Sequence, residues 1–321
     1  MAFTRRTLLL SVAAAAMMPV FAQDRRRLVI VTGGTGGVFY PYGGGLAKVL
    51  SETMANTQAT AQVTGGSVDN VKLLSEGEAD IGFSTIDSAY DGFTGSGAYT
   101  DEGPQNIGLI ARLYNSFLHV VANEASGIDS IAAMKGKRIS VGSAGSSTES
   151  VADRMLAAAG LDPMTDVTRD NLSVSESAGA LADGKIDAFF WIGGLPTAAV
   201  KDLASAGQTK LRFIGTATEM MVMRTRYPDL YLELTMAAGT YPGQADEVRG
   251  LGVANVLVVS GEADDTLVSD VLTAIFDHLD AVHAIHPEAA SLTLAGAIVS
   301  TKAPWHPAAT AFYAARGVTA P

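Results

Sequence analysis

A short apolar run that ends in a glycine-rich turn constrains this chain more than any other feature. Leu28–Val31 holds four apolar residues, as a buried strand does, and Thr32–Gly37 then holds four glycines. Pro41 fits the first turn of a helix, where its missing N–H costs no hydrogen bond. Glycines let backbone N–H groups approach a ligand, and a helix N-terminus carries a partial positive charge. The sequence therefore predicts that main chain in this turn captures a carboxylate or phosphate.

The first residues follow the order of a secretory signal. Arg5 and Arg6 precede an apolar run over 8–20, and the residues just after it predict cleavage behind Ala22. We expect residues 1–22 to be a signal peptide, and the paired arginines also resemble a twin-arginine signal, which implies export in the folded state. The chain contains no cysteine, and export without disulfides suits a bacterial periplasm.

The charge of the chain excludes some partners. The sequence has 22 basic and 33 acidic residues, for a net charge of −11, and loss of Arg5 and Arg6 with the signal would make it −13. Such a chain should repel nucleic acid and anionic membrane surfaces. An anionic solute would therefore be held by local backbone and hydroxyl donors instead of a basic field.

Short apolar runs alternate with helical segments along the chain. Strands are expected over 28–31, 59–63, 79–83, 118–122, 138–141, 186–191 and 254–259, and two helical stretches over 264–284 and 287–298 close the chain. This alternation predicts α/β units with a mainly parallel sheet. We expect lobe 1 over 23–119 plus 258–321 and lobe 2 over 120–257, joined by two crossing strands. Ligands bind at the carboxyl ends of such strands, which here face a cleft between the lobes.

Seven segments spread over the chain carry a family resemblance. They are TGGTGGVFYPYGG at 32–44, TGGSVDNVKLLSEGEADIGF at 64–83, DSAY at 87–90, MKGKR at 134–138, VGSAGSSTES at 141–150, DGKIDAFFWIGGLPTAAV at 183–200 and AGTYPGQ at 238–244. With them the chain resembles the TAXI-family solute-binding subunits of tripartite ATP-independent periplasmic (TRAP) transporters. The resemblance implies a type II periplasmic-binding-protein fold with two α/β lobes.

The resemblance also implies a ligand class and a partner. Relatives bind glutamate, related amino acids or small dicarboxylates such as 2-oxoglutarate, and deliver them to a membrane permease, here expected to be a fused one. Family members often have Gln-Ser before Asp87, where this chain has Thr85 and Ile86, and the loop at 144–148 departs from the Pro-Gly-Ser-Gly-Thr style. Both loops should line the cleft, so the ligand of this chain can differ from that of its relatives.

The candidate ligand-binding residues follow the strands at the expected cleft edge. Backbone N–H groups and hydroxyls should hold the carboxylate, and Tyr40 and Trp191 should wall the cleft. Asp87 either accepts from a ligand ammonium group or caps the short helix after Ser84. The full set is Thr35, Gly36, Gly37, Tyr40, Gly66, Ser67, Asn70, Thr85, Asp87, Ser143, Gly145, Ser146, Ser147, Thr148, Phe190, Trp191 and Gly193. We expect a monomer that has no catalytic residue, cofactor or metal.

Enzymatic alternatives lack complete motifs. The VTGGTGG start is shared with short-chain dehydrogenases, but Phe39 stands where a third glycine is needed, and no tyrosine is followed by lysine four residues on. Ser143 is out of register for a G-x-S-x-G nucleophile. His283 and His286 lack a paired carboxylate signature for zinc. His119 is expected to be a buried, hydrogen-bonded histidine. A sensor that uses the same fold to report a solute to a signalling protein stays open.

Overall fold

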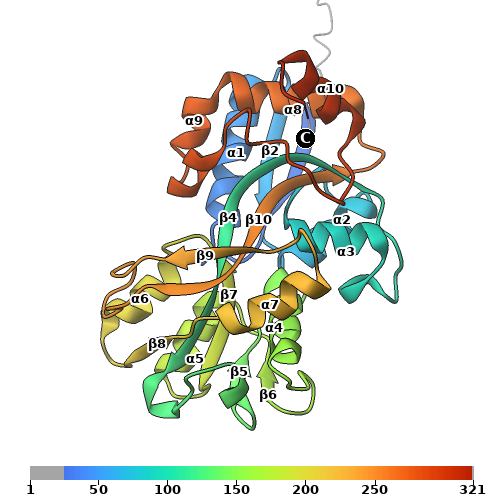
Figure 1. Ribbon diagram of the computed structural model, residues 1–321. Helices are drawn as coiled ribbons and strands as arrows, with labels where there is room; N and C mark the ends of the chain where they lie inside the picture. Colours follow the sequence, from blue (N-terminus) through green and yellow to red (C-terminus); the bar gives the residue numbers. More distant parts are fainter. Residues whose placement is uncertain (1–24, 320–321) are drawn as a thin grey trace, which may run out of the picture.

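The computed structural model describes residues 25–319 as two α/β lobes joined by two long strands (Figure 1). This confirms the predicted two-lobe α/β architecture. The expected signal peptide, 1–22, lies outside the described residues.

Ten strands lie in the described residues and pair into one sheet. They are β1 (Arg26–Val31), β2 (Thr57–Gln62), β3 (Ile81–Thr85), β4 (Ile107–Asn123), β5 (Arg138–Ser140), β6 (Thr168–Asp170), β7 (Ala188–Gly193), β8 (Leu211–Phe213), β9 (Leu232–Met236) and β10 (Val248–Ser260).

Ten α-helices cover this sheet in the same described part of the chain. They are α1 (Phe39–Thr53), α2 (Ser67–Ser75), α3 (Ile86–Thr94), α4 (Ser147–Ala158), α5 (Val174–Ala182), α6 (Ala198–Ala206), α7 (Ala217–Arg226), α8 (Asp265–Asp277), α9 (Leu279–His283) and α10 (Pro307–Ala315). Four short 3-10 helices complete the set: η1 (Gly97–Tyr99), η2 (Glu124–Ser126), η3 (Ala132–Met134) and η4 (Pro287–Ser291).

Parallel pairing is confined to the inside of each lobe. In the first lobe β1 pairs in parallel with β2 and β3, and in the second lobe β5 pairs in parallel with β6 and β7. Strands β4 and β10 lie between these two groups and pair antiparallel to each other and to their neighbours. The sheet is therefore mixed, and the expectation of a mainly parallel sheet holds only within the lobes.

The two crossing strands are much longer than the sequence pattern indicates. β4 has 17 residues and β10 has 13, and both run through the two lobes. The sequence pattern finds only 118–122 and 254–259 because polar residues such as Asn115 and Ser116 interrupt the apolar run of β4. The lobe boundaries predicted at 119/120 and 257/258 fall inside these strands.

The end of the chain differs from its predicted helices. Pro287 starts only the 3-10 helix η4, and the chain then continues through turns and bends beside β4, with a hydrogen bond of 2.7 Å from Arg112 N–H to Ala297 O. The α-helix expected over 287–298 is therefore wrong, because its apolar residues are buried by a segment without regular helix. The sequence pattern missed α10, which begins with Pro307 behind a His306 cap.

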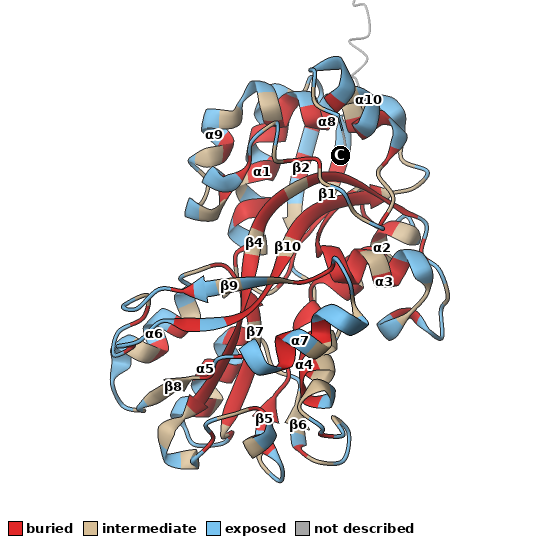
Figure 2. Ribbon diagram, in the orientation of Figure 1, coloured by how far each residue is buried: buried red, intermediate tan, exposed pale blue. Residues whose placement is uncertain are grey.

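The buried side chains form a core in each lobe and a third that joins them. Figure 2 shows burial concentrated on the strands and on the helix faces against them. One apolar cluster packs α1, α8 and α10 in the first lobe, and another packs α5, α6 and β7 in the second. The third runs along β4 and β10 and includes Val68 and Val71 of α2 with Val151 and Met155 of α4. The lobes thus share apolar contact beside the crossing strands.

None of the helices in the described residues is both long and apolar enough to cross a membrane.

Candidate ligand-binding cleft

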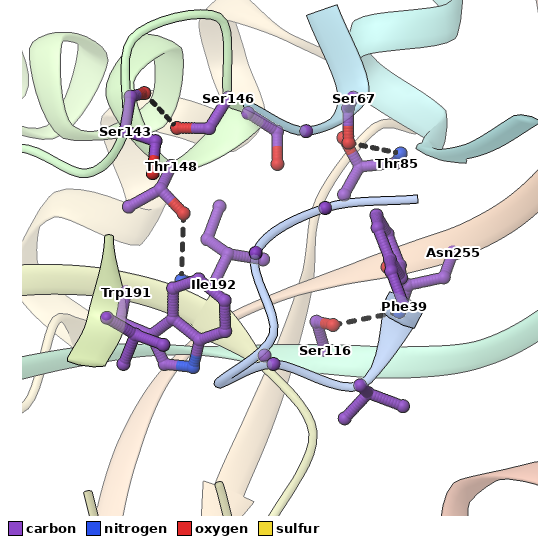
Figure 3. Close-up of a pocket in the computed structure, with 18 of the residues that line it drawn as sticks. Phe39, Ser67, Thr85, Ser116, Ser143, Ser146, Thr148, Trp191, Ile192 and Asn255 are labelled. Atoms are coloured by element: carbon purple, nitrogen blue, oxygen red, sulfur yellow. Dashed lines mark hydrogen bonds between the residues drawn. The ribbon is translucent and has the colours of Figure 1, made fainter. Parts of the chain in front are cut away.

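A cavity of about 50 Å³ lies between the two lobes, and Figure 3 shows its wall. A single water molecule needs a cavity of about 10–15 Å³, so this cavity can hold a small molecule. The wall consists of Gly33, Gly34, Gly37, Val38, Phe39, Gly65, Gly66, Ser67, Thr85, Tyr114, Ser116, Ser143, Ser146, Ser147, Thr148, Ser173, Val174, Trp191, Ile192, Gly193 and Asn255.

The wall is built at the carboxyl ends of the parallel strands in both lobes. The loops after β1 and β2 and the end of β3 supply one side, and the loops after β5 and β6 and the end of β7 supply the other. Strands β4 and β10 add Tyr114, Ser116 and Asn255. Because side chains from both lobes and both crossing strands meet here, the cavity is the predicted cleft edge.

Five helices begin at this cavity. The residues that precede the first turn of α1, α2, α3, α4 and α5 all belong to its wall. They are Val38, Gly66, Thr85, Ser146 and Ser173. A helix N-terminus carries roughly half a positive charge, so the convergence of five favours an anion, although the first turns of α2, α3, α4 and α5 each also hold one acidic residue.

Backbone donors remain available at two of these helix starts. The N–H groups of Gly66 and Ser67 at α2 and of Ser147 and Thr148 at α4 have no partner within residues 25–319. Buried backbone N–H groups are nearly always hydrogen-bonded, so a ligand or water is expected there. The two helices belong to different lobes, and a single anion can therefore be held from both sides.

Two hydroxyls in the wall can donate to a ligand. Ser67 Oγ accepts from Thr85 N–H at 3.1 Å, and Thr148 Oγ1 accepts from Ile192 N–H at 3.2 Å. Since each oxygen already accepts a protein hydrogen bond, its own proton is free for a ligand oxygen. Figure 3 shows the two residues on opposite sides of the wall.

No charged side chain belongs to the described wall of the cavity. A bound anion would therefore be neutralised by helix dipoles and hydroxyl protons alone. That local donors hold an anionic solute in place of a basic field stays a prediction.

Three aromatic residues line the cavity: Tyr114 of β4, and Phe39 and Trp191 from opposite lobes (Figure 3). Trp191 Nε1–H donates to Thr197 Oγ1 at 2.9 Å, which fixes the indole plane. A Cβ on Gly37 would lie 2.8 Å from Trp191 Cη2, so only glycine lets the first-lobe turn approach this ring so closely.

The structure brings ten of the predicted residues into the cavity wall. They are Gly37, Gly66, Ser67, Thr85, Ser143, Ser146, Ser147, Thr148, Trp191 and Gly193. Seven others lie outside it, namely Thr35, Gly36, Tyr40, Asn70, Asp87, Gly145 and Phe190.

The residues outside the wall have other partners. Asn70 Nδ2 donates to Phe83 O at 2.7 Å and to Thr32 O, which ties the α2 helix to β1 and β3. Tyr40 is 37% exposed on the first turn of α1. Phe190 points into the shared apolar core, because successive side chains of a strand face opposite ways and Trp191 takes the cavity face.

Asp87 lies in a buried ion-pair cluster instead of the cavity. Tyr231 OH donates to Asp87 Oδ2 at 2.8 Å, and Arg154 Nη1 lies 3.6 Å from the same oxygen. Arg154 also pairs with Asp91. Burial raises the pKa of Asp91 above its usual value, although the guanidinium acts in the opposite direction. The structure thus places Asp87, expected to meet a ligand ammonium group, in a contact between α3 of the first lobe and α4 of the second.

Gly145 joins the lobes through its main chain. Its carbonyl accepts from the N–H groups of Val68 and Asp69, both at 3.1 Å, and so caps α2 from the opposite lobe. The residue has φ of +74°, and a Cβ at this position would overlap Asp69 Oδ1. Glycine is therefore required at position 145 for two reasons: the positive φ of its backbone and the close approach of the other lobe.

His119 is a buried histidine with a full set of partners, as predicted. Its Nδ1 faces the carbonyls of Phe117 and Trp191 at 3.1 and 3.2 Å, so this nitrogen carries the proton. Its Nε2 then accepts from Tyr241 OH at 2.7 Å, and the Tyr241 oxygen accepts from Thr197 N–H. This chain of hydrogen bonds supports the loop that holds Trp191.

The wall residues that the sequence pattern missed are of two kinds. Some flank predicted loops, namely Gly33, Gly34, Val38, Phe39, Gly65 and Ile192. The others come from the crossing strands and the start of α5, namely Tyr114, Ser116, Ser173, Val174 and Asn255. For Ser173 a signal existed, since Ser173 and Glu176 form a capping box. A polar residue inside a long apolar strand is the corresponding signal for Ser116 and Asn255.

Residues 30–317 match the family model of the NMT1-like family, which is most of the chain. The chain belongs to the NMT1-like family. The match extends from the first strand to beyond α10 and so takes in both lobes and the cavity between them.

Solved structures of binding proteins share the fold of this NMT1-like chain. A binding protein component of an ABC phosphonate transporter from Pseudomonas aeruginosa has a TM-score of 0.53 at 12% identity, over 83% of this chain and 79% of that one. An ancestral arginine-binding protein bound to arginine has a TM-score of 0.50 at 15% identity, over 83% and 99% of the two chains. These likenesses confirm the predicted type II periplasmic-binding-protein fold, and at such identities they show the fold alone. Membership of the TAXI family stays a prediction.

We predict that Gly145→Ala opens the cleft. The added Cβ would overlap Asp69 Oδ1 in the other lobe, and Asp69 is held there by a hydrogen bond from Gly65 N–H, so we expect the lobes to move apart. The measurement is small-angle X-ray scattering, in which the variant should have a larger radius of gyration than the wild type. Gly127→Ala is the matched control, because Gly127 has φ of +75° with open space around it. Equal scattering by the two variants would contradict the prediction.

We predict that His119 makes stability depend on pH. Burial lowers the pKa of His119 to about 4, against about 6.5 in the unfolded chain. The folded state holds the neutral ring, so its contribution is full above pH 6.5 and is lost as pH falls towards 4, by up to about 3 kcal/mol. Urea unfolding at several pH values should show this loss for the wild type but not for His119→Gln. His278→Gln, at an exposed position, should keep the wild-type slope; identical slopes in all three would exclude His119 as the cause.

Proposed function

We propose that this protein is a periplasmic solute receptor of the TAXI type. It binds a small carboxylate by closure of its lobes and delivers the solute to a TRAP permease. The observation that carries the proposal is the cavity, where five helix N-termini and two donor hydroxyls converge without a charged side chain in the described wall. A carboxylate accepts several hydrogen bonds at once and is stabilised by such donors.

Contacts across the cleft support lobe closure as the binding motion. The Gly145 carbonyl caps α2 from the other lobe, and Arg154 pairs with Asp87 and Asp91 across the same gap. Leu195 N–H in the second lobe donates to Glu288 Oε1 in the first at 2.8 Å. These contacts lie around the cavity instead of in it, so closure can seal a bound solute from water. Hinge closure of two domains about a ligand is a common motion of such folds.

The cavity chemistry supports binding over hydrolysis. Ser143 and Ser146 line the wall, but no histidine, lysine or carboxylate lies beside them among the lining residues. Ser146 Oγ donates to Ser143 O at 2.6 Å and accepts from Glu149 N–H, so its hydrogen bonds serve as a helix cap. A serine nucleophile needs a base within hydrogen-bond reach, and this pair has none in the described wall.

The wall also bears on which carboxylate is bound. A glutamate-like amino acid brings an ammonium group, and Asp87, the carboxylate expected to meet it, is paired with Arg154. A buried ammonium without a counter-charge is costly. The arrangement therefore favours 2-oxoglutarate and other carboxylates without an ammonium group over glutamate.

Transport and export rest on the sequence. The seven segments that resemble TAXI subunits point to a TRAP permease as partner, and the signal over 1–22 points to the periplasm. A receptor that reports its solute to a signalling protein would use the same cavity.

We predict that isothermal titration calorimetry detects binding of at least one small carboxylate. The panel contains glutamate, 2-oxoglutarate, and C4 dicarboxylates such as succinate and malate, with arginine as a cationic control. An uncharged wall with helix N-termini should bind carboxylates and leave arginine unbound. Silence across the carboxylates, or binding of arginine alone, would count against the proposed function.

We predict that Thr148→Val weakens binding of that carboxylate about tenfold or more. The substitution keeps the shape but removes the hydroxyl proton available to the ligand, together with the acceptor of the Ile192 N–H. A hydrogen bond to a charged group is worth about 1.5–3 kcal/mol. Thr218→Val is the matched control, because Thr218 is exposed on α7 away from the cavity. The affinities come from the same titration, and an unchanged affinity for Thr148→Val would remove this hydroxyl from the site.

A further inference from the structure

Two polar side-chain atoms in the cavity wall have no partner within the described residues. They are Asn255 Oδ1 and Thr85 Oγ1. Both side chains are buried, with exposures of 0% and 1%. A buried polar atom is rarely left unpaired, and each exception calls for an explanation. Since both atoms belong to a ligand cavity, the explanation we pursue is a ligand group that meets them.

The hydrogen bonds of Asn255 fix which end of its amide faces the ligand. Its Nδ2 donates to Tyr114 O at 3.2 Å and to Ser116 Oγ at 2.8 Å. A backbone carbonyl only accepts, so the amide nitrogen must lie on the Tyr114 side. The oxygen Oδ1 then faces away from β4, and it can only accept. Asn255 therefore offers a ligand an acceptor and no donor.

An irregularity in the β4–β10 pairing sets this orientation. Ala254 pairs with Asn115, but Val256 pairs with Arg112, so β4 carries one extra residue opposite Asn255. Such bulges turn side chains near binding sites and leave backbone groups outside the ladder. Here the Tyr114 carbonyl at the bulge is taken by the Asn255 amide.

Asn255 and Thr85 act on the same part of the cavity. They are paired residues of β10 and β3, and Figure 3 shows them on the same side of the wall. Thr85 Oγ1 belongs to a hydroxyl, which can donate as well as accept. A ligand group placed between them therefore meets an obligate acceptor and an available donor.

We propose that the carboxylate ligand carries a neutral hydroxyl group that is read by this pair, with Asn255 as the specificity-determining residue. A hydroxyl satisfies both atoms, because it donates to Asn255 Oδ1 and accepts from Thr85 Oγ1. A keto oxygen would place two acceptors face to face at Asn255. An ammonium group would satisfy Asn255 but would add a positive charge where the described wall has no carboxylate. The ligand class is thus a hydroxy acid, and this inference rests on the proposed carboxylate site.

The test compares matched acids that differ only in the group read by Asn255. The probes are lactate, pyruvate and alanine, and 2-hydroxyglutarate, 2-oxoglutarate and glutamate, with both enantiomers of each chiral acid. Isothermal titration of the wild-type protein should show the hydroxy acid binding at least about tenfold tighter than its keto and amino counterparts. Equal or tighter binding of a keto or amino acid overturns the inference but leaves the carboxylate site standing. Silence of all six acids overturns this inference, and it overturns the proposed function as well when succinate and malate are also silent.

A variant then assigns the preference to Asn255. In Asn255→Leu the hydroxy-to-keto affinity ratio should fall to within about threefold, because the acceptor is gone. A defect in folding would weaken all acids alike and leave the ratio unchanged, so the ratio separates recognition from structure. Asn123→Leu is the control, since Asn123 lies at the far end of β4 and caps a turn outside the cavity. A wild-type ratio in Asn255→Leu would overturn the assignment, and the wild-type titration alone decides the ligand class should the variant not fold.

Discussion

The antiparallel pairing of β4 and β10 is the constraint on which the rest of the structure depends. These strands are the central pair of the sheet, so β3 of the first lobe and β7 of the second take their register from them. They also supply the cavity with Tyr114, Ser116 and Asn255. A slip of one residue would turn every side chain of a strand to the other face. Because both lobes and the cavity share this register, a change in the pairing of β4 and β10 would displace the sheet and the site alike.

Main-chain electrostatics explain how an acidic protein can receive an anion. The chain has a net charge of −11, yet five helix N-termini meet at one cavity in its described part. Each contributes roughly half a positive charge that acts within the first turn, where a surface field is screened. A lysine or arginine in the wall would attract any anion strongly. Fixed dipoles and hydroxyls instead bind an anion well only when its oxygens lie where these donors point. An uncharged wall therefore favours selection of the ligand by its pattern of hydrogen-bonding groups, and Asn255 and Thr85 contribute to that selection.

The fold and about half of the cavity wall could be predicted from the sequence. Residues were predictable where neighbouring residues in the sequence carry the information, and were missed where the information lies in distant segments. Loops such as Ser143–Thr148 can be predicted from the local sequence, because glycines and hydroxyl residues cluster where a strand ends and a helix begins. The only local signal for Asn255 is a polar residue inside an apolar strand, and its orientation depends on a bulge in another strand. Asp87 differs in that its position after β3 is predictable from the sequence but its partners are not. Arg154 and Tyr231 come from distant segments and bind its carboxylate, which the local sequence does not show.

The Arg154 cluster suits a receptor that must open again. It buries an arginine between two aspartates and a tyrosine, with the guanidinium 4.2 Å from the Tyr227 ring centre. Burying such charges costs desolvation that nearly offsets their attraction, so the pair fixes the geometry of closure and adds little net free energy. An apolar contact of the same size would favour the closed lobes whether or not a solute is bound. The apolar contact between α2 and α4 also favours the closed lobes. A solute adds to it, because the unpaired donors of α2 and α4 and the unpaired atoms of Thr85 and Asn255 gain hydrogen-bond partners from a solute that fills the cavity.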